Sequence, residues 1–141
     1  MLLILTCCLV YICYCDVTVR RIPNRWLLVL LGNTLIINIV MGIYSGWLTA
    51  LVVFGMTAIL VEANVFGAGD SKLATVLALA LPLSSLPFAL WLTVMVGGGL
   101  AVFYWLKYRL IKRKLKGMDP GLPYGLAIAI GFYIPIIVQL L

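Results

Sequence analysis

The chemistry that this chain could perform depends on its acidic side chains, of which there are only four. Asp16, Glu62 and Asp70 lie at or inside the ends of long apolar segments. Asp119 lies in a basic stretch beside a proline, where we expect it to be solvated or to form a turn. Placing a carboxylate in apolar surroundings is costly, so acids in such positions are candidates for function. We therefore treat the first three as candidate functional residues.

Asp16 and Asp70 are far apart in sequence but fall at one predicted depth, so helix packing would bring them together. Two carboxylates at close range do not ionise together readily; one keeps its proton, and the pair titrates as a unit. Such a pair supplies a general base that activates water and a general acid that protonates a leaving amine. The alternative is structural: Asp16 marks a helix end, and Asp70, which follows Gly-Ala-Gly, is an N-cap. The residues alone leave both interpretations open.

Other kinds of hydrolytic site are poorly represented in the sequence. The chain has no histidine, which excludes Ser-His and Cys-His nucleophile pairs and any zinc site that uses imidazole. Cys7, Cys8, Cys13 and Cys15 all fall in one apolar segment, and no second cysteine segment exists to complete a metal or redox cluster. We interpret them as small apolar residues and expect neither a metal nor a cofactor.

The composition indicates the environment in which the acids must act. Of the 141 residues, 65% are hydrophobic and only 10% are charged, and the mean hydropathy is +1.22. An ordinary soluble domain carries about 25% charged residues. The values therefore exclude a soluble globular protein, and the apolar content excludes a disordered chain. We predict an all-α polytopic membrane protein in which residues 1–141 form a single domain.

The distribution of charge predicts how many helices cross the membrane. Uncharged runs cover 1–15, 26–61, 73–106 and 120–141. A helix needs about 20 residues to cross the hydrocarbon core, so each of the two middle runs is long enough for two crossings. Each also contains a cluster of turn-forming residues near its middle. The predicted spans lie near residues 1–17, 23–42, 46–65, 70–84, 87–106 and 122–140.

The basic residues predict the orientation of these spans. All ten fall at 18–25, at 107–121 or at Lys72, whereas the connections 43–46 and 84–87 carry no charge. By the positive-inside rule, the charged side is cytoplasmic and both termini are extracytoplasmic. The basic run within 107–121 is interpreted as a determinant of orientation that contacts anionic lipid, and no nucleic acid is expected as a partner. The predicted location is the inner membrane.

Three local sequences resemble the motifs of the type IV prepilin peptidases. Asp16 is followed six residues later by Ile-Pro-Asn, as in the family's first aspartate motif. The segment 67–73 reads Gly-Ala-Gly-Asp-Ser-Lys-Leu and is similar to the second motif, Gly-x-Gly-Asp-x-Lys-Leu. Residues 123–125, Pro-Tyr-Gly, resemble the opening of the family's last span, although Leu126 replaces the usual proline. The motifs occur in the family's order, and the resemblance covers essentially the whole chain.

The resemblance implies a membrane-embedded aspartic endopeptidase that removes the short basic leader from prepilins and pseudopilins on the cytoplasmic side. In this family the cut typically follows a glycine that precedes the pilin's hydrophobic helix. Asp16 and Asp70 match the catalytic aspartates. Gly67 and Gly69 would give the backbone the freedom that a bulky residue would block, and would let an extended substrate approach closely.

Two further residues are assigned as candidate substrate contacts. Lys72 matches the family position, and its partner is the substrate, a lipid or a carboxylate. Glu62 precedes Asp70 by eight residues and either lines the same cavity or makes a polar contact between helices. A single span precedes Asp16, so the chain resembles the small peptidase-only type of tight-adherence (Flp) pilus systems. We therefore expect cleavage without N-methylation of the new terminus.

Three alternative functions stay open at the level of sequence. The nearest is an archaeal preflagellin peptidase, which a neighbouring pilin-like gene would distinguish. A small proton-coupled transporter would use Asp16, Glu62 and Asp70 as a relay, and its flux would respond to ion gradients. A non-catalytic assembly scaffold would tolerate the loss of either aspartate. The oligomeric state is not indicated by the sequence.

Overall fold

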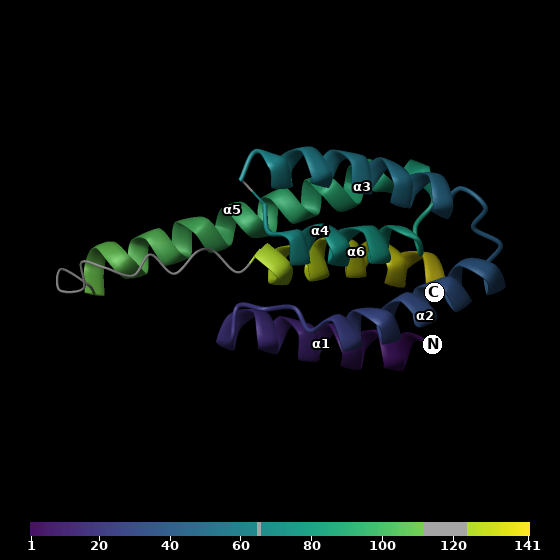
Figure 1. Ribbon diagram of the computed structural model, residues 1–141, viewed down its shortest axis with the longest axis horizontal. Coiled ribbons are helices and arrows are strands. Elements are labelled where there is room, and N and C mark those ends of the chain that lie inside the picture. The colour runs from purple at the N-terminus through teal and green to yellow at the C-terminus, as the bar shows by residue number, and fades with distance from the viewer. Residues whose placement is uncertain (65, 112–123) are drawn as a thin grey trace.

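The computed structural model describes residues 1–64, 66–111 and 124–141, and within these ranges it is helical without strands (Figure 1). The predicted all-α class is confirmed. The elements are α1 (Leu2–Thr18), α2 (Asn24–Val40), α3 (Gly46–Glu62), α4 (Ala68–Ala78), the short 3-10 helix η1 (Leu83–Ser85), α5 (Leu86–Ile111) and α6 (Tyr124–Leu140). Most of the predicted spans correspond to one of these helices.

The fourth predicted span was wrong at its C-terminal end. We expected a helix over 70–84, but α4 has only 11 residues and ends at Ala78. Pro82 excludes a helix that continues through residue 81, because a proline disfavours helical backbone in the residue before it, and α4 ends three residues before that point. The chain instead tightens into turns, in which the amide of Ala80 donates to the carbonyl of Leu77. At 1.5 Å per residue, α4 is about 16 Å long, roughly half of a hydrocarbon core.

One helical segment, Leu83–Lys107, is both long enough and apolar enough to cross a membrane on its own. Four other helices (α1, α2, α3 and α6) are apolar but have 17 residues each. Such a helix is about 25 Å long, slightly less than the typical hydrocarbon thickness of about 30 Å. The number of crossings therefore remains a prediction from the sequence.

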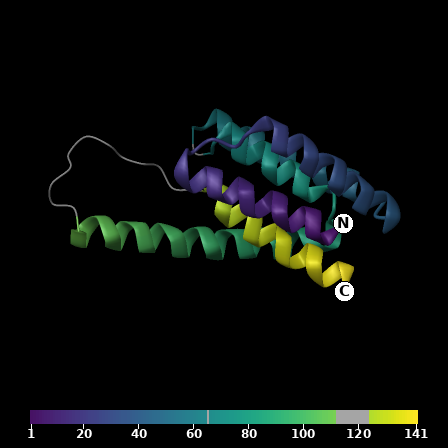
Figure 2. The same cartoon turned by 90° about the horizontal axis from the view of Figure 1, so that it is seen from below.

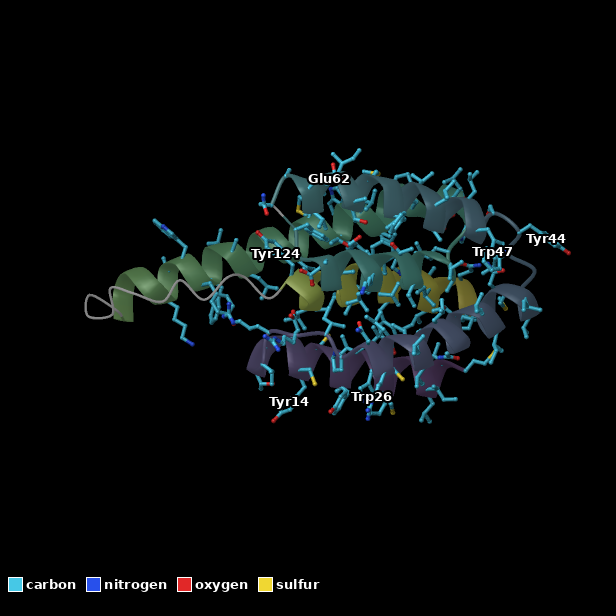
Figure 3. All side chains as sticks on the ribbon, viewed as in Figure 1. Tyr14, Trp26, Tyr44, Trp47, Glu62 and Tyr124 are labelled. Atoms are coloured by element: carbon cyan, nitrogen blue, oxygen red, sulfur yellow. The ribbon has the colours of Figure 1, made fainter. Side chains whose placement is uncertain are left out.

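The outer surface of the bundle is strongly apolar. The outward faces of α2, α3 and α5 expose large aliphatic and aromatic side chains along their length. Examples are Leu28, Val29, Ile36 and Ile39 on α2, Leu51, Phe54 and Ile59 on α3, and Val94, Val102 and Phe103 on α5. Tyr44 and Trp47 are also exposed and lie together at one end of the bundle (Figure 3). Exposed apolar surface of this extent marks a surface that is covered by lipid or by another protein.

The interior of the bundle is built around α4 and α6. Helix α4 contacts α2, α3 and α6, and α6 contacts α1, α4 and α5. Their buried faces combine large aliphatic residues with alanine and glycine, which lets the helix axes approach closely. Helix α5 packs mainly on α6 and extends past the other helices at the end where α6 begins (Figure 1, Figure 2). Both termini lie at the opposite end (Figure 1), and Tyr44 lies on that side of the molecule in the same view (Figure 3).

At the end of the bundle that holds the termini, one buried amide ties three helices together. Asn38 Nδ2 on α2 donates to the carbonyl of Ile43 at 2.9 Å and to the carbonyl of Leu79 at 2.7 Å. Gly46, the first residue of α3, packs directly on this amide, and a Cβ at Gly46 would collide with Asn38 Nδ2 and with the Leu79 carbonyl oxygen. The junction therefore depends on a glycine where α3 begins.

We predict that Gly46→Ala lowers the free energy of unfolding by about 1–3 kcal/mol, because the added methyl group overpacks this junction. The matched control is Gly55→Ala on the same helix, where a Cβ would meet nothing within 4 Å. Alanine is the better helix former by about 1 kcal/mol, so the control should be as stable as the parent or more so. Thermal or chemical unfolding in detergent measures the difference. Equal stability of the two variants would contradict the proposed packing.

Candidate active site

The structure brings Asp16 and Asp70 together at the end of the bundle opposite the termini. Asp16 lies in the last turn of α1 and is 7% exposed, and Asp70 lies in the first turn of α4 and is half-buried. Gly125 lies beside both: a Cβ built on it would lie 2.7 Å from Asp16 Oδ2 and 3.4 Å from Asp70 Oδ1. The two oxygens are thus at most about 6 Å apart, the sum of those distances, which is close enough for the two ionisations to be coupled.

Both carboxylates lie against the N-terminus of a helix. The backbone amides of Gly125 and Leu126, in the first turn of α6, are directed at the Asp16 carboxyl. Asp70 accepts from the backbone amide of Gly67, the residue that caps α4, in the manner of a capping box. Free amides and the helix dipole stabilise negative charge at these positions. Within the described residues, Asp16 Oδ2 is buried and has no hydrogen-bond partner.

The two glycines of the second motif have different surroundings. A Cβ at Gly67 would lie 2.8 Å from Asp70 Oδ2, so a larger residue would displace that carboxylate. Gly67 itself has φ −77° and ψ 141°, which any residue adopts, so the expected conformational freedom is not what requires a glycine. A Cβ at Gly69 would make ordinary contact with Ile22 at 3.5 Å. Gly67 is therefore explained by the space that Asp70 occupies.

A cavity of about 410 Å³ opens beside the two carboxylates. It lies between the end of α1, the connection to α2 and the start of α4, and the glycines of the second motif line it. Three basic residues (Arg20, Arg21 and Lys72) also line it and are exposed at its edge. Lys72 thus lies at the site, as expected. The cavity is thus lined by two acids and has basic residues at its edge, and it is open to a ligand from outside the bundle.

Glu62 lies apart from the carboxylate pair. It is the last residue of α3, it is exposed, and it is not among the residues that line the 410 Å³ cavity. Figure 3 places it on the outer side of α3, across the bundle from α1. The expectation that Glu62 shares this cavity is therefore not met among the residues that the structure describes. Asp119 lies outside those residues.

The position of Gly125 beside both acids was not predicted from the sequence. Gly125 was expected only to belong to the segment that opens the last helix, yet its amide is directed at Asp16 and a Cβ on it would lie 3.4 Å from Asp70 Oδ1. The Pro-Tyr-Gly motif was the feature of the sequence that could have identified Gly125 as a site residue.

Arg20 is a second residue of the site that was not predicted. It interacts electrostatically with Asp16. Its φ of 55° is left-handed, and in this conformation it caps the end of α1, a position where glycine is usual. No pattern in the sequence identifies that conformation.

The cysteines of α1 are free thiols that lie along the length of the helix. Cys8 and Cys15 are buried, and Cys7 and Cys13 are more accessible. Over residues 1–64, 66–111 and 124–141, no group of three His, Cys, Asp or Glu side chains could hold a metal ion. Among the described residues, the acids at this end of the bundle therefore form a pair, Asp16 and Asp70, and not a metal-binding group.

The comparisons with known proteins gave one match. No curated protein and no solved structure matches the chain significantly. The type IV leader peptidase family matches residues 3–102, which is most of the chain and includes both Asp16 and Asp70. The match ends within α5, so the contact made by Gly125 comes from a part of the chain beyond it. Because the match covers well over half of the sequence, the chain belongs to the type IV leader peptidase family.

Proposed function

We propose that the protein is an aspartic endopeptidase that removes the leader peptide from prepilins or pseudopilins at the cytoplasmic face of the inner membrane. Membership of the leader peptidase family implies a peptidase with prepilin substrates. The observation that supports the aspartic mechanism is that Asp16 and Asp70 both lie beside Gly125 and line one open cavity. No metal and no cofactor enters the proposed reaction.

In the proposed mechanism the two carboxylates share one proton. The ionised carboxylate accepts a proton from water as the water oxygen attacks the carbonyl carbon of the scissile peptide bond. The protonated carboxyl stabilises the developing oxyanion, and a proton then passes to the leaving nitrogen as the carbon–nitrogen bond breaks. Asp16 and Asp70 act as one unit, because neither group alone can hold and release the proton at the right moments.

The immediate surroundings support this assignment. The amides at the start of α6 hold Asp16 in place, and the amide of Gly67 holds Asp70, so neither carboxylate depends on a mobile partner for its position. The transporter alternative would need a relay that includes Glu62, and that residue lies apart from the pair. The geometry thus favours hydrolysis over proton-coupled transport.

We further propose that six segments cross the membrane with both termini outside the cytoplasm. The end of the bundle that holds the cavity carries Arg20, Arg21, Arg25 and Lys72. The connections at the other end, 41–45 and 79–85, carry no charge. Under the positive-inside rule the cavity faces the cytoplasm, where an unprocessed prepilin leader is located. The short helix α4 lies within the bundle and is shielded from lipid by its neighbours.

The first prediction is that Asp16→Asn, Asp70→Asn and the double variant have nearly the same low residual activity. An amide preserves size but does not exchange protons at neutral pH, so each change should reduce turnover about 10²–10⁴-fold. Residues that act as a unit lose nearly everything with either partner, so the double variant should lose little more. The measurement is cleavage of purified prepilin, with folding checked by gel filtration in detergent.

The matched control for these variants is Glu62→Gln, the same chemical change at an exposed acid outside the cavity. It should retain activity near that of the parent. A well-folded Asp16→Asn or Asp70→Asn variant that processes prepilin at the parental rate would rule out the aspartic mechanism.

A second prediction concerns the glycine beside the carboxylates. In Gly125→Ala the methyl group would meet Asp16 Oδ2 at 2.7 Å and displace it. Because small displacements of reacting groups are expensive, we expect kcat to fall about tenfold or more with the bundle still folded. Gly99→Ala is the control, since a Cβ at Gly99 meets nothing within 4 Å. Unchanged kcat in a folded Gly125→Ala variant would show that Gly125 does not hold the pair in position.

The proposed orientation is tested with single cysteines in a background in which all four native cysteines are replaced. Tyr44 is 92% exposed at one end of the bundle, and Lys107 is exposed on the part of α5 that extends from the other end. A membrane-impermeant maleimide should label Tyr44→Cys in intact cells and Lys107→Cys only after permeabilisation. Labelling of Lys107→Cys in intact cells would overturn the proposed topology.

A further inference from the structure

A second cavity, of about 320 Å³, lies between α5 and α6. We propose that this α5–α6 groove is the docking site for the apolar helix that follows the cleavage point of the substrate, an inference that rests on the proposed function. The groove is lined by Phe66, by Thr93, Val94, Gly97, Gly98 and Ala101 of α5, and by Tyr124, Ala127 and Ile128 of α6.

The groove adjoins the candidate active site. Phe66, which lines the groove, precedes Gly67, where a Cβ would lie 2.8 Å from the Asp70 carboxylate. Tyr124, which also lines the groove, precedes Gly125, where a Cβ would lie within 3.4 Å of both carboxylates. The Phe66 and Tyr124 rings pack against each other at 5.8 Å between their centroids, and Figure 3 shows Tyr124 where α6 begins, beside α5. The groove thus begins one residue along the chain from the glycines that lie beside the acids.

The shape of the groove suits a helix. Helices α5 and α6 contact each other where Gly131 packs on Thr93 and where a Cβ at Gly97 would meet Ala127 at 3.6 Å. Gly98 lies beside this line of contact, and a Cβ there would meet nothing within 4 Å. Residues 94, 97, 98 and 101 recur once per turn, so they form one stripe about 10 Å long on α5. The stripe leaves open surface on which a second helix backbone can approach closely.

The chemistry of the lining selects an apolar helix. None of the residues that line the groove is charged, and Val94 is 67% exposed. The Thr93 hydroxyl is already satisfied, because it donates to the Ala89 carbonyl at 2.8 Å. An extended peptide would leave its backbone amides unpaired on this surface, whereas a helix satisfies them internally. The cations of the site are confined to the other cavity, which contains the aspartates.

The groove on the opposite side of α6 is less suited to this role. It lies between α1 and α6 and is also apolar. A hydrogen bond of 2.6 Å joins Thr6 of α1 to the Tyr133 hydroxyl of α6, and both residues line that groove. The link ties the α1 wall of that groove to its α6 wall. We therefore place the substrate helix on the α5 side.

The test compares Gly98→Leu with Gly99→Leu. Both glycines are exposed, both have open space for a side chain, and only Gly98 lines the groove. Leucine is a better helix former than glycine, so neither change should weaken α5. Two substrates are used: the full-length prepilin, and a peptide that contains the leader and the cleavage point but ends before the apolar helix.

We expect Gly98→Leu to raise KM for the full-length prepilin about tenfold or more while leaving cleavage of the short peptide unchanged. Gly99→Leu should match the parent with both substrates. Equal KM values for full-length prepilin in the two variants would overturn the proposal and would fit a groove that holds lipid. Loss of cleavage of both substrates by Gly98→Leu would also overturn it, since the change would then act on the aspartates.

A cross-linking measurement gives an independent readout. In a cysteine-free background inactivated by Asp16→Asn, Gly98→Cys should form a disulfide with a cysteine placed in the apolar helix of the prepilin, and Gly99→Cys should not. Equal cross-linking at both positions would contradict docking in the groove. A parent protein that does not cleave prepilin would refute the proposed function itself, which separates that failure from failure of the groove.

Discussion

The arrangement of this protein depends on holding two carboxylates together inside an apolar bundle. Like charges at this separation repel, and burial removes the water that would otherwise stabilise them. The bundle meets this cost with helix N-termini: the amides of Gly125 and Leu126 are directed at Asp16, and the amide of Gly67 is directed at Asp70. Gly125 has no side chain, so α6 can begin directly beside both acids, where a Cβ would lie 2.7 Å from Asp16 Oδ2 and 3.4 Å from Asp70 Oδ1.

This requirement explains why α4 and α6 form the centre of the bundle. Each begins at the site, and each is packed by other helices along its length. The buried residues of both include alanine or glycine, which lets the axes approach closely. Helix α4 has only 11 residues, and α2, α3 and α6 all pack on it. The site is therefore positioned by helices rather than by loops, as a precise pair of acids needs.

The two cavities at the site differ in the ligands they suit. The cavity beside the aspartates has a basic rim, and the α5–α6 groove has no charged lining residue. Phe66 and Tyr124, which line the groove, are chain neighbours of Gly67 and Gly125, the glycines beside the acids. A substrate with a polar cleavage region followed by an apolar helix would match both surfaces at once. Helix α5 would then serve the substrate, because its packing within the bundle is largely limited to α6 and η1.

Much of the fold could be predicted because it depends on local chemistry. The uncharged runs and turn clusters predicted the helical segments. The fourth segment ends at Ala78 rather than near 84, because the chain already tightens into turns before Pro82. The three local motifs predicted the family, and two of them identified Asp16 and Asp70 as the acids that meet. Hydropathy and turn formation depend on residues that are neighbours in the chain, so both can be predicted from the local sequence.

Only the tertiary structure decided which side chains meet. It placed Gly125 beside both acids, gave Arg20 a left-handed conformation near Asp16, and left Glu62 on the outer side of α3 (Figure 3). Glu62 and Asp70 are close in sequence, whereas Asp16 and Gly125 are separated by most of the chain, yet the second pair is in contact. The reason is physical: contacts between remote helices follow from how whole surfaces pack, and no short stretch of sequence contains that information.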